Sequence, residues 1–148
     1  MDTPPLVRLF VGRQAIFDDR LKTFAYELLY RSGASDRYDA TDPVSATTSV
    51  IANAFLALPV EKVVERRKAF INFPRELLVA PEGPGLPART AVLEILESVT
   101  PDGEVIEACR RLKGQGYQLA LDDFVIGEGF GPLIDLADYI KVDFLSTS

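Results

Sequence analysis

The chain has 148 residues, of which 47% are apolar and 26% charged, and its formal net charge is −6. This composition suits one folded domain and excludes a disordered chain. The negative charge argues against general binding to DNA, which depends on neutralising phosphates. No apolar run reaches the roughly 18 residues of a membrane helix, and the first residues lack the features of a secretory signal. We therefore expect a cytoplasmic protein that binds neither DNA nor a membrane.

Missing residue types narrow the chemistry further. The sequence has no histidine, no tryptophan and one cysteine, Cys109. Catalysis with a histidine base, histidine zinc sites and an internal disulfide are therefore excluded within this chain. Any chemistry must use carboxylates, amides, lysine or a metal ion held by oxygen ligands.

The chain is expected to open with a hairpin. Residues 6–17 and the aromatic and aliphatic residues 23–30 predict two strands, and Asp18-Asp19-Arg20 predicts the turn between them. Asp42-Pro43 favours a helix start, and apolar residues at helical spacing predict an amphipathic helix that ends near Pro59.

From about residue 70 onward, short strands and helices alternate. Strands are expected at 69–73, 90–96, 117–124 and 138–144, helices at 76–79, 102–114 and 132–137, and loops at 81–87 and 127–131. On the helix that Asp102 opens, the expected buried residues are Val105, Ile106, Cys109 and Leu112. Alternation of this kind is typical of a parallel sheet covered by helices.

Most of these strands carry a polar residue where a buried parallel strand should be apolar. These residues are Glu27, Asn72, Glu94, Glu97, Asp122, Asp123, Lys141 and Asp143. The C-terminal ends of strands in a parallel barrel converge on one mouth, which would bring such side chains together. Carboxylates that repel one another are commonly relieved by a divalent cation, and a metal pair would activate a water and hold a phosphodiester.

Each of these residues also has an ordinary structural explanation. Asp122-Asp123 can cap a helix or begin a turn, and Asn72 can be a turn residue. Glu27 can lie on the surface of an edge strand, and Lys141 can pair with Asp143 on a half-exposed strand. Their recurrence at successive strand ends is what favours a functional site.

The order of these segments resembles the EAL family of cyclic di-guanylate phosphodiesterases over almost the whole chain. Gly12 to Asp18 is similar to the family's opening Gln-Pro-Ile strand, with Ala15 in the place of proline, and Tyr26 to Arg31 is similar to the signature Glu-Ala-Leu-Leu-Arg. Four further matches follow in order: Phe-Ile-Asn-Phe-Pro at 70–74, Leu-Glu-Ile-Leu-Glu-Ser at 93–98, Leu-Ala-Leu-Asp-Asp-Phe at 119–124 and Tyr-Ile-Lys-Val-Asp at 139–143. The opening from Arg13 to Arg31 resembles EAL domains that precede an HDOD domain.

The resemblance implies an α/β fold, namely a partial (β/α)8 TIM-type barrel with about six of the eight strands and an antiparallel opening strand. It implies Mg²⁺ or Mn²⁺ ligands among Glu27, Asn72, Glu94, Asp122 and Asp123, and catalytic roles for Glu27, Asp122 and Lys141, the lysine polarising the attacking water or a phosphate oxygen. Gln14 and Arg31 would contact cyclic di-GMP, and Glu97 would support the loop after Phe124.

The chain also departs from the family pattern. Active members continue after Asp-Asp-Phe with Gly-Thr-Gly-Tyr-Ser-Ser, whereas this chain has Val-Ile-Gly-Glu-Gly-Phe at 125–130. Val125 removes backbone freedom, and Glu128 adds negative charge near the mouth. Residues 1–148 are therefore expected to form one EAL-like domain with impaired catalysis, truncated at its C-terminal end. Open strand edges predict a homo-oligomer, and an HDOD-type domain is the expected partner in a longer chain.

Three functions remain open on this sequence. The first is a regulatory domain that binds cyclic di-GMP with impaired catalysis. The second is an active Mg²⁺- or Mn²⁺-dependent phosphodiesterase that yields the linear dinucleotide. The third is a protein-interaction scaffold without a ligand, whose stability neither metal nor nucleotide would raise.

Overall fold

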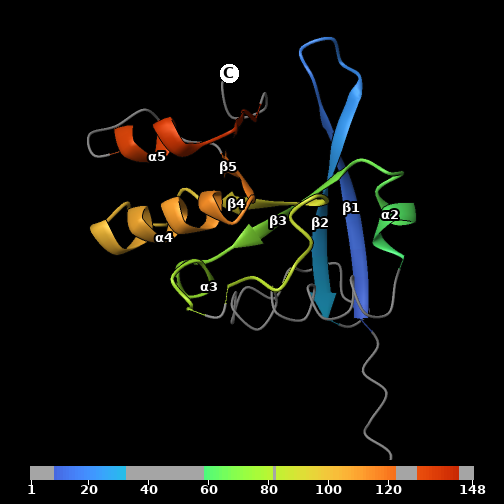
Figure 1. Ribbon diagram of the computed structural model, residues 1–148. Coiled ribbons are helices and arrows are strands. Elements are labelled where there is room, and N and C mark those ends of the chain that lie inside the picture. Colours follow the sequence, from blue (N-terminus) through green and yellow to red (C-terminus); the bar gives the residue numbers. More distant parts are fainter. Residues whose placement is uncertain (1–8, 33–58, 82, 123–129, 144–148) are drawn as a thin grey trace, which may run out of the picture.

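Six strands form one sheet in the part of the chain that the computed structural model describes, namely residues 9–32, 59–81, 83–122 and 130–143. The strand order is β1-β2-β3-β4-β5-β6, so each strand lies beside its neighbour in sequence. β1 (Leu9–Phe17) and β2 (Thr23–Ser32) pair antiparallel, and β2 through β6 run parallel (Figure 1). The antiparallel opening strand is therefore confirmed.

The remaining elements follow the predicted alternation closely. The strands are β3 (Lys68–Phe73), β4 (Ala91–Ile95), β5 (Gln118–Asp122) and β6 (Tyr139–Lys141), and the helices are α2 (Val60–Val63), α3 (Arg75–Leu78), α4 (Gly103–Gly114) and α5 (Gly131–Leu136). The short helix α2 is not predicted by the sequence. The amphipathic helix expected to end near Pro59 lies outside the described residues, as does most of the loop at 127–131.

Helix α4 begins and packs as its sequence predicts, with one difference. The side chain of Asp102 accepts a hydrogen bond from the Val105 backbone nitrogen at 2.9 Å, which caps the helix. Val105, Ala108, Cys109 and Leu112 are buried, whereas Ile106 is only half-buried. Ala108 thus takes the place in the buried stripe that Ile106 was expected to fill.

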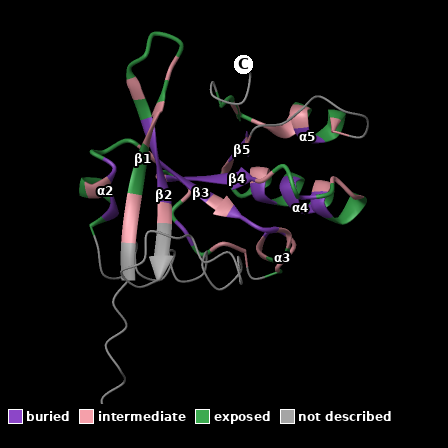
Figure 2. Ribbon diagram, turned by 180° about the vertical axis from the view of Figure 1, so that it is seen from behind, coloured by how far each residue is buried: buried purple, intermediate pink, exposed green. Residues whose placement is uncertain are grey.

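The sheet has a helix-covered face and an inner face. Alternate residues of β3, β4 and β5 pack with α4 and α5 in the main core, which includes Ile71, Leu93, Leu119, Leu112 and Leu133. The helices α3, α4 and α5 lie on the same side of the sheet, and buried residues concentrate in the central strands (Figure 2). The opposite face is lined by a smaller cluster of Ala25, Phe70, Val92 and Ala120, with Ile16 and Tyr139 packed against it. We call this cluster the inner apolar layer.

The β1–β2 hairpin is closed by the predicted turn and contains a bulge. Asp18 Oδ1 accepts hydrogen bonds from the backbone nitrogens of Arg20 and Lys22, both at 2.9 Å. In the ladder Ile16 pairs with Ala25 and Phe17 with Thr23, so Phe24 is the extra residue. The bulge lets the Phe24 ring contact Phe70 and Tyr139, with ring centroids 6.4 Å and 5.3 Å away.

Candidate functional site

A layer of polar side chains lies directly beyond the inner apolar layer. On each of the strands β2 to β6, one residue belongs to the inner apolar layer or packs against it, and the residue two positions later is polar. Side chains two positions apart on a strand share a face. These residues are Glu27 after Ala25, Asn72 after Phe70, Glu94 after Val92, Asp122 after Ala120 and Lys141 after Tyr139. Because these strands are parallel, the polar layer lies toward their C-terminal ends, as the sequence predicts.

The ammonium group of Lys141 lies among three carboxylates of this layer. Its Nζ is 2.6 Å from Glu94 Oε1, 3.1 Å from Glu27 Oε2 and 3.5 Å from Asp122 Oδ1. The lysine is on β6 and its partners are on β4, β2 and β5, so the cluster joins four strands of the sheet. Its formation depends on the curl of the sheet, which brings β6 across from β2.

Burial governs the protonation of this cluster. The Glu94 side chain has no exposed surface, and Glu27 is 8% exposed. Desolvation, reinforced by the negative charge of Glu27, raises the pKa of Glu94 to about 8 despite the nearby lysine. Burial alone would lower the pKa of Lys141, but Glu94, Glu27 and Asp122 outweigh it and raise that pKa above its ordinary value. Lys141 therefore stays cationic, while Glu94 readily holds a proton at neutral pH.

The donor chemistry of the layer fits a hard divalent cation. Its ligands would be carboxylate and amide oxygens, and Glu94 Oε2 is buried without a hydrogen-bond partner in the described part of the chain. Within the same residues, however, no three acidic or thiol groups are gathered closely enough to enclose a metal ion. The carboxylates are held around Lys141, so a cation would have to bind beside the lysine, at the free oxygen of Glu94.

The other predicted site residues lie around this layer or outside the described chain. Gln14 is exposed on β1, and its Cα pairs with that of Glu27, which places it at the rim of the layer. Arg31 belongs to β2, but its side chain is not described. Glu97 is exposed just past β4 and is not part of the layer. Asp123 and the predicted loop after Phe124 lie outside the described residues.

An aromatic floor beneath the polar layer is the feature that the sequence motifs do not reveal. The rings of Phe70 and Tyr139 lie 5.5 Å apart, and Phe24 contacts both. Phe70 and Tyr139 precede Asn72 and Lys141 by two positions, so strand alternation could have placed them. The bulge that turns Phe24 onto them has no such signal in the sequence.

Comparison with known proteins identifies relatives over nearly the full chain. No family model matches it. The chain is 37% identical over 147 residues to the Bacillus subtilis protein YuxH, covering 96% of this chain and 36% of YuxH. It is 34% identical over 138 residues to the Vibrio cholerae cyclic di-GMP phosphodiesterase CdgJ, covering 93% of this chain and 32% of CdgJ. The chain thus spans about a third of the length of these two relatives.

Solved structures share the fold at lower sequence identity. The EAL domain of Mycobacterium smegmatis DcpA superimposes with a TM-score of 0.65 at 23% identity, over 92% of this chain and 66% of that one. Klebsiella pneumoniae BlrP1, solved as a manganese and cyclic di-GMP complex, gives a TM-score of 0.65 at 22% identity, over 94% and 41% of the two chains. These matches confirm the predicted α/β fold, a partial TIM-type barrel.

The fold and the site together define a class of protein: a parallel barrel domain with an antiparallel opening strand and an acidic layer at its C-terminal strand ends. The chain shares this fold with EAL domains of known structure, and it is similar in sequence to a cyclic di-GMP phosphodiesterase. The predicted motifs at Glu27, Asn72, Glu94, Asp122 and Lys141 lie on successive strands of that fold.

Proposed function

We propose that this chain serves cyclic di-GMP signalling as an EAL-type domain that binds the dinucleotide at the polar layer and hydrolyses it poorly. The observation that carries the proposal is the convergence of three carboxylates on Lys141 at the C-terminal strand ends. This is the end of a parallel barrel at which ligands are bound and chemistry occurs. The relationship to CdgJ, whose name states a cyclic di-GMP phosphodiesterase, supports the choice of ligand.

Each residue of the layer has a proposed part in binding. Lys141 supplies a lasting positive charge for a phosphate oxygen or for the attacking water, because its pKa is raised. Gln14 and Arg31 contact the dinucleotide at the rim. The ligands for Mg²⁺ or Mn²⁺ are Glu27, Asn72, Glu94, Asp122 and Asp123. When bound, such a cation stabilises negative charge on a phosphodiester.

Impaired hydrolysis is proposed from the sequence that follows the polar layer. Val125 stands where active relatives have glycine, and Glu128 adds a carboxylate. In the described layer, three of the carboxylates proposed as cation ligands already pair with Lys141 through one oxygen each. Ion pairing of this kind competes with metal binding, since both draw on the same negative charge.

An active phosphodiesterase is the second candidate, and a specific observation favours it. The five residues that the resemblance implicates on the described strands as metal ligands or catalytic groups are present in one layer, and a relative that is named as a phosphodiesterase is 34% identical. In this case Glu27 and Asp122 act with Lys141 in hydrolysis to the linear dinucleotide.

Calorimetric titration of cyclic di-GMP, with Mg²⁺ or Mn²⁺ present, separates the two candidates. The titrated samples are then analysed by chromatography for the linear product. Binding without product supports the regulatory function, and binding with product supports the enzyme. Glu94→Gln should weaken binding, whereas Glu107→Gln, on the exposed surface of α4, should not. Absence of binding in the unmodified chain under all conditions would refute both candidates.

Within the described residues, none of the helices has the length and hydropathy to cross a membrane.

We further propose that an HDOD-type domain is the partner of this chain and that the chain self-associates. Sedimentation of the purified protein over a range of concentrations tests self-association, since a homo-oligomer formed through strand edges must dissociate on dilution.

A further inference from the structure

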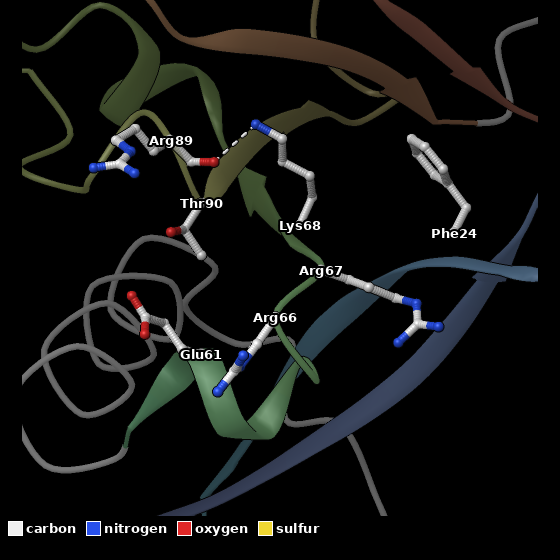
Figure 3. Close-up of a pocket in the computed structure, with 7 residues that line it drawn as sticks. All are labelled: Phe24, Glu61, Arg66, Arg67, Lys68, Arg89 and Thr90. Atoms are coloured by element: carbon white, nitrogen blue, oxygen red, sulfur yellow. Dashed lines mark hydrogen bonds between the residues drawn. The ribbon is translucent and has the colours of Figure 1, made fainter.

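The opposite end of the inner face carries a second polar feature, with the reverse charge. A pocket of about 510 Å³ is lined by Phe24, Arg66, Arg67, Lys68, Arg89 and Thr90, together with Glu61 (Figure 3). Most of these residues lie at or just before the starts of strands: Lys68 is the first residue of β3, and Thr90 immediately precedes β4. Glu61 belongs to the helix α2. We call this feature the basic pocket. The inner apolar layer separates it from the polar layer at the other strand ends.

Positive charge in the basic pocket is left largely uncompensated. Its lining contains four cationic side chains and one carboxylate, Glu61, in a chain whose net charge is −6. Arg66 and Arg89 make no side-chain hydrogen bond or ion pair with any other described residue. Lys68 Nζ donates to the backbone oxygen of Arg89 at 2.8 Å, and a neutral carbonyl leaves the lysine's charge in place. The residues are thus positioned to attract an anion.

The turn before β3 is held in an unfavourable backbone conformation that presents these cations. Glu65 and Arg66 are consecutive non-glycine residues in the left-handed region, with φ of 52° and 62°. Glu65 is fixed by hydrogen bonds or ion pairs from Tyr26 (3.0 Å), Arg13 (3.2 Å) and Arg67 (3.3 Å). Strain of this kind persists only where surrounding contacts compensate for it, and it concentrates at functional sites.

One wall of the pocket is aromatic. Phe24 is 38% exposed, and the bulge in β2 rests its ring against Phe70 and Tyr139. In Figure 3, Lys68 lies between Phe24 on one side and Arg89 on the other. An exposed ring flanked by cations suits a ligand with a phosphate group and a flat ring system.

We propose that the basic pocket binds the phosphate group of a small soluble molecule. Its volume falls within the usual range for small-molecule sites. Arginine guanidinium groups bind phosphate through paired hydrogen bonds, and the Thr90 hydroxyl adds a neutral donor. Two sources of phosphate share this chemistry, namely a nucleotide and an inorganic polyphosphate. The site is independent of the polar layer and of the dinucleotide function proposed for it.

The test is calorimetric titration with inorganic tripolyphosphate and with ATP as probes, in the absence of divalent cations. The variant Arg66→Asn combined with Arg89→Gln removes two charges, and asparagine tolerates the left-handed conformation of position 66. This double variant should weaken binding of both probes by about tenfold or more. Arg110→Gln, which removes an exposed charge on α4, is the matched control and should leave binding unchanged. Thermal melting confirms that each variant is folded.

Further arms separate the two sources of phosphate. Tighter binding of ATP than of tripolyphosphate, lost in Phe24→Ala, identifies a nucleotide, and equal binding identifies inorganic polyphosphate. Absence of binding, equal loss in Arg110→Gln, or binding only to vesicles of anionic phospholipid would each overturn the proposal.

Discussion

The cationic side chains at the two ends of the inner face differ in their burial and in their charged partners. At the C-terminal strand ends, Lys141 is only 20% exposed and has three carboxylate partners. At the N-terminal strand ends, Arg66 and Arg89 are exposed and have no charged partner among the described residues. A buried charge must be compensated inside the protein, whereas an exposed one is stabilised by water. The polar layer is therefore essential to stability, and the basic pocket is free to serve a ligand.

Removing the central cation of the polar layer should give the largest effect. Lys141→Met leaves Glu27 and Glu94 buried without a positive charge, which typically costs about 3–5 kcal/mol of unfolding free energy. Urea denaturation at pH 8 measures the loss, and the loss should shrink at pH 5, where Glu94 is protonated. Arg110→Met removes an exposed ion pair and should cost less than about 1 kcal/mol. Equal costs for the two variants would contradict this account of the layer.

The buried charges of the polar layer should also make the stability of the fold depend on pH. The folded pKa of Glu94 is about 8 against an ordinary value of 4.5, so the folded state keeps a proton that the unfolded state releases. In metal-free buffer, the unfolding free energy should therefore fall as pH rises from 4.5 to 8, by up to about 1.4 kcal/mol per unit from this group. The raised pKa of Lys141 stabilises the fold below 10.5, and this contribution is constant over that window.

The variant Glu94→Gln isolates this contribution. Glutamine keeps the shape of the side chain but cannot titrate, so the fall in stability between pH 4.5 and 8 should be much reduced. Urea unfolding at a series of pH values measures the slope in both proteins. A variant with the unchanged slope would show that another group causes the pH dependence.

Divalent cations should act on one end of the sheet alone. If Mn²⁺ binds the polar layer, saturation at a hundred times the dissociation constant adds about 2.7 kcal/mol of stability. Glu27→Ala removes a proposed ligand and should abolish this gain, whereas Arg89→Gln in the basic pocket should retain it. Thermal melting with and without Mn²⁺ measures both, and an equal gain in Glu27→Ala would exclude Glu27 as a ligand.

How far the sequence predicts this structure depends on the range of the contacts involved. Strand alternation is local, so Glu27, Asn72, Glu94, Asp122 and Lys141 could be assigned to strands and to one end of the sheet. The position of Lys141 among the three carboxylates could not, because it requires a contact across 114 positions with Glu27. That contact depends on the curl of the whole sheet.

The basic end of the sheet was less predictable, because its features override local preference. Helix α2 has only four residues, two of them valine, and its packing of Val60 and Val64 against Tyr26 comes from tertiary contacts. The bulge at Phe24 and the left-handed turn at Glu65 and Arg66 likewise contain no glycine or asparagine from which they could have been predicted. Segments whose structure contradicts their local sequence preference are often functional or strained sites.

The smallest predicted effect tests whether the left-handed turn really stores strain. Arg66→Gly should raise the unfolding free energy by roughly 0.5–1 kcal/mol, because glycine adopts positive φ without a steric penalty, and Arg66 makes no side-chain hydrogen bond or ion pair that the described residues would lose. The matched change Arg110→Gly in α4 should instead lower it by about 1 kcal/mol, as glycine does within a helix. Urea midpoints of the two variants measure the opposite signs. Destabilisation by both would show that Arg66 has a structural role, and stabilisation by Arg66→Gly alone would show that the fold tolerates a cost to keep a cation at the basic pocket.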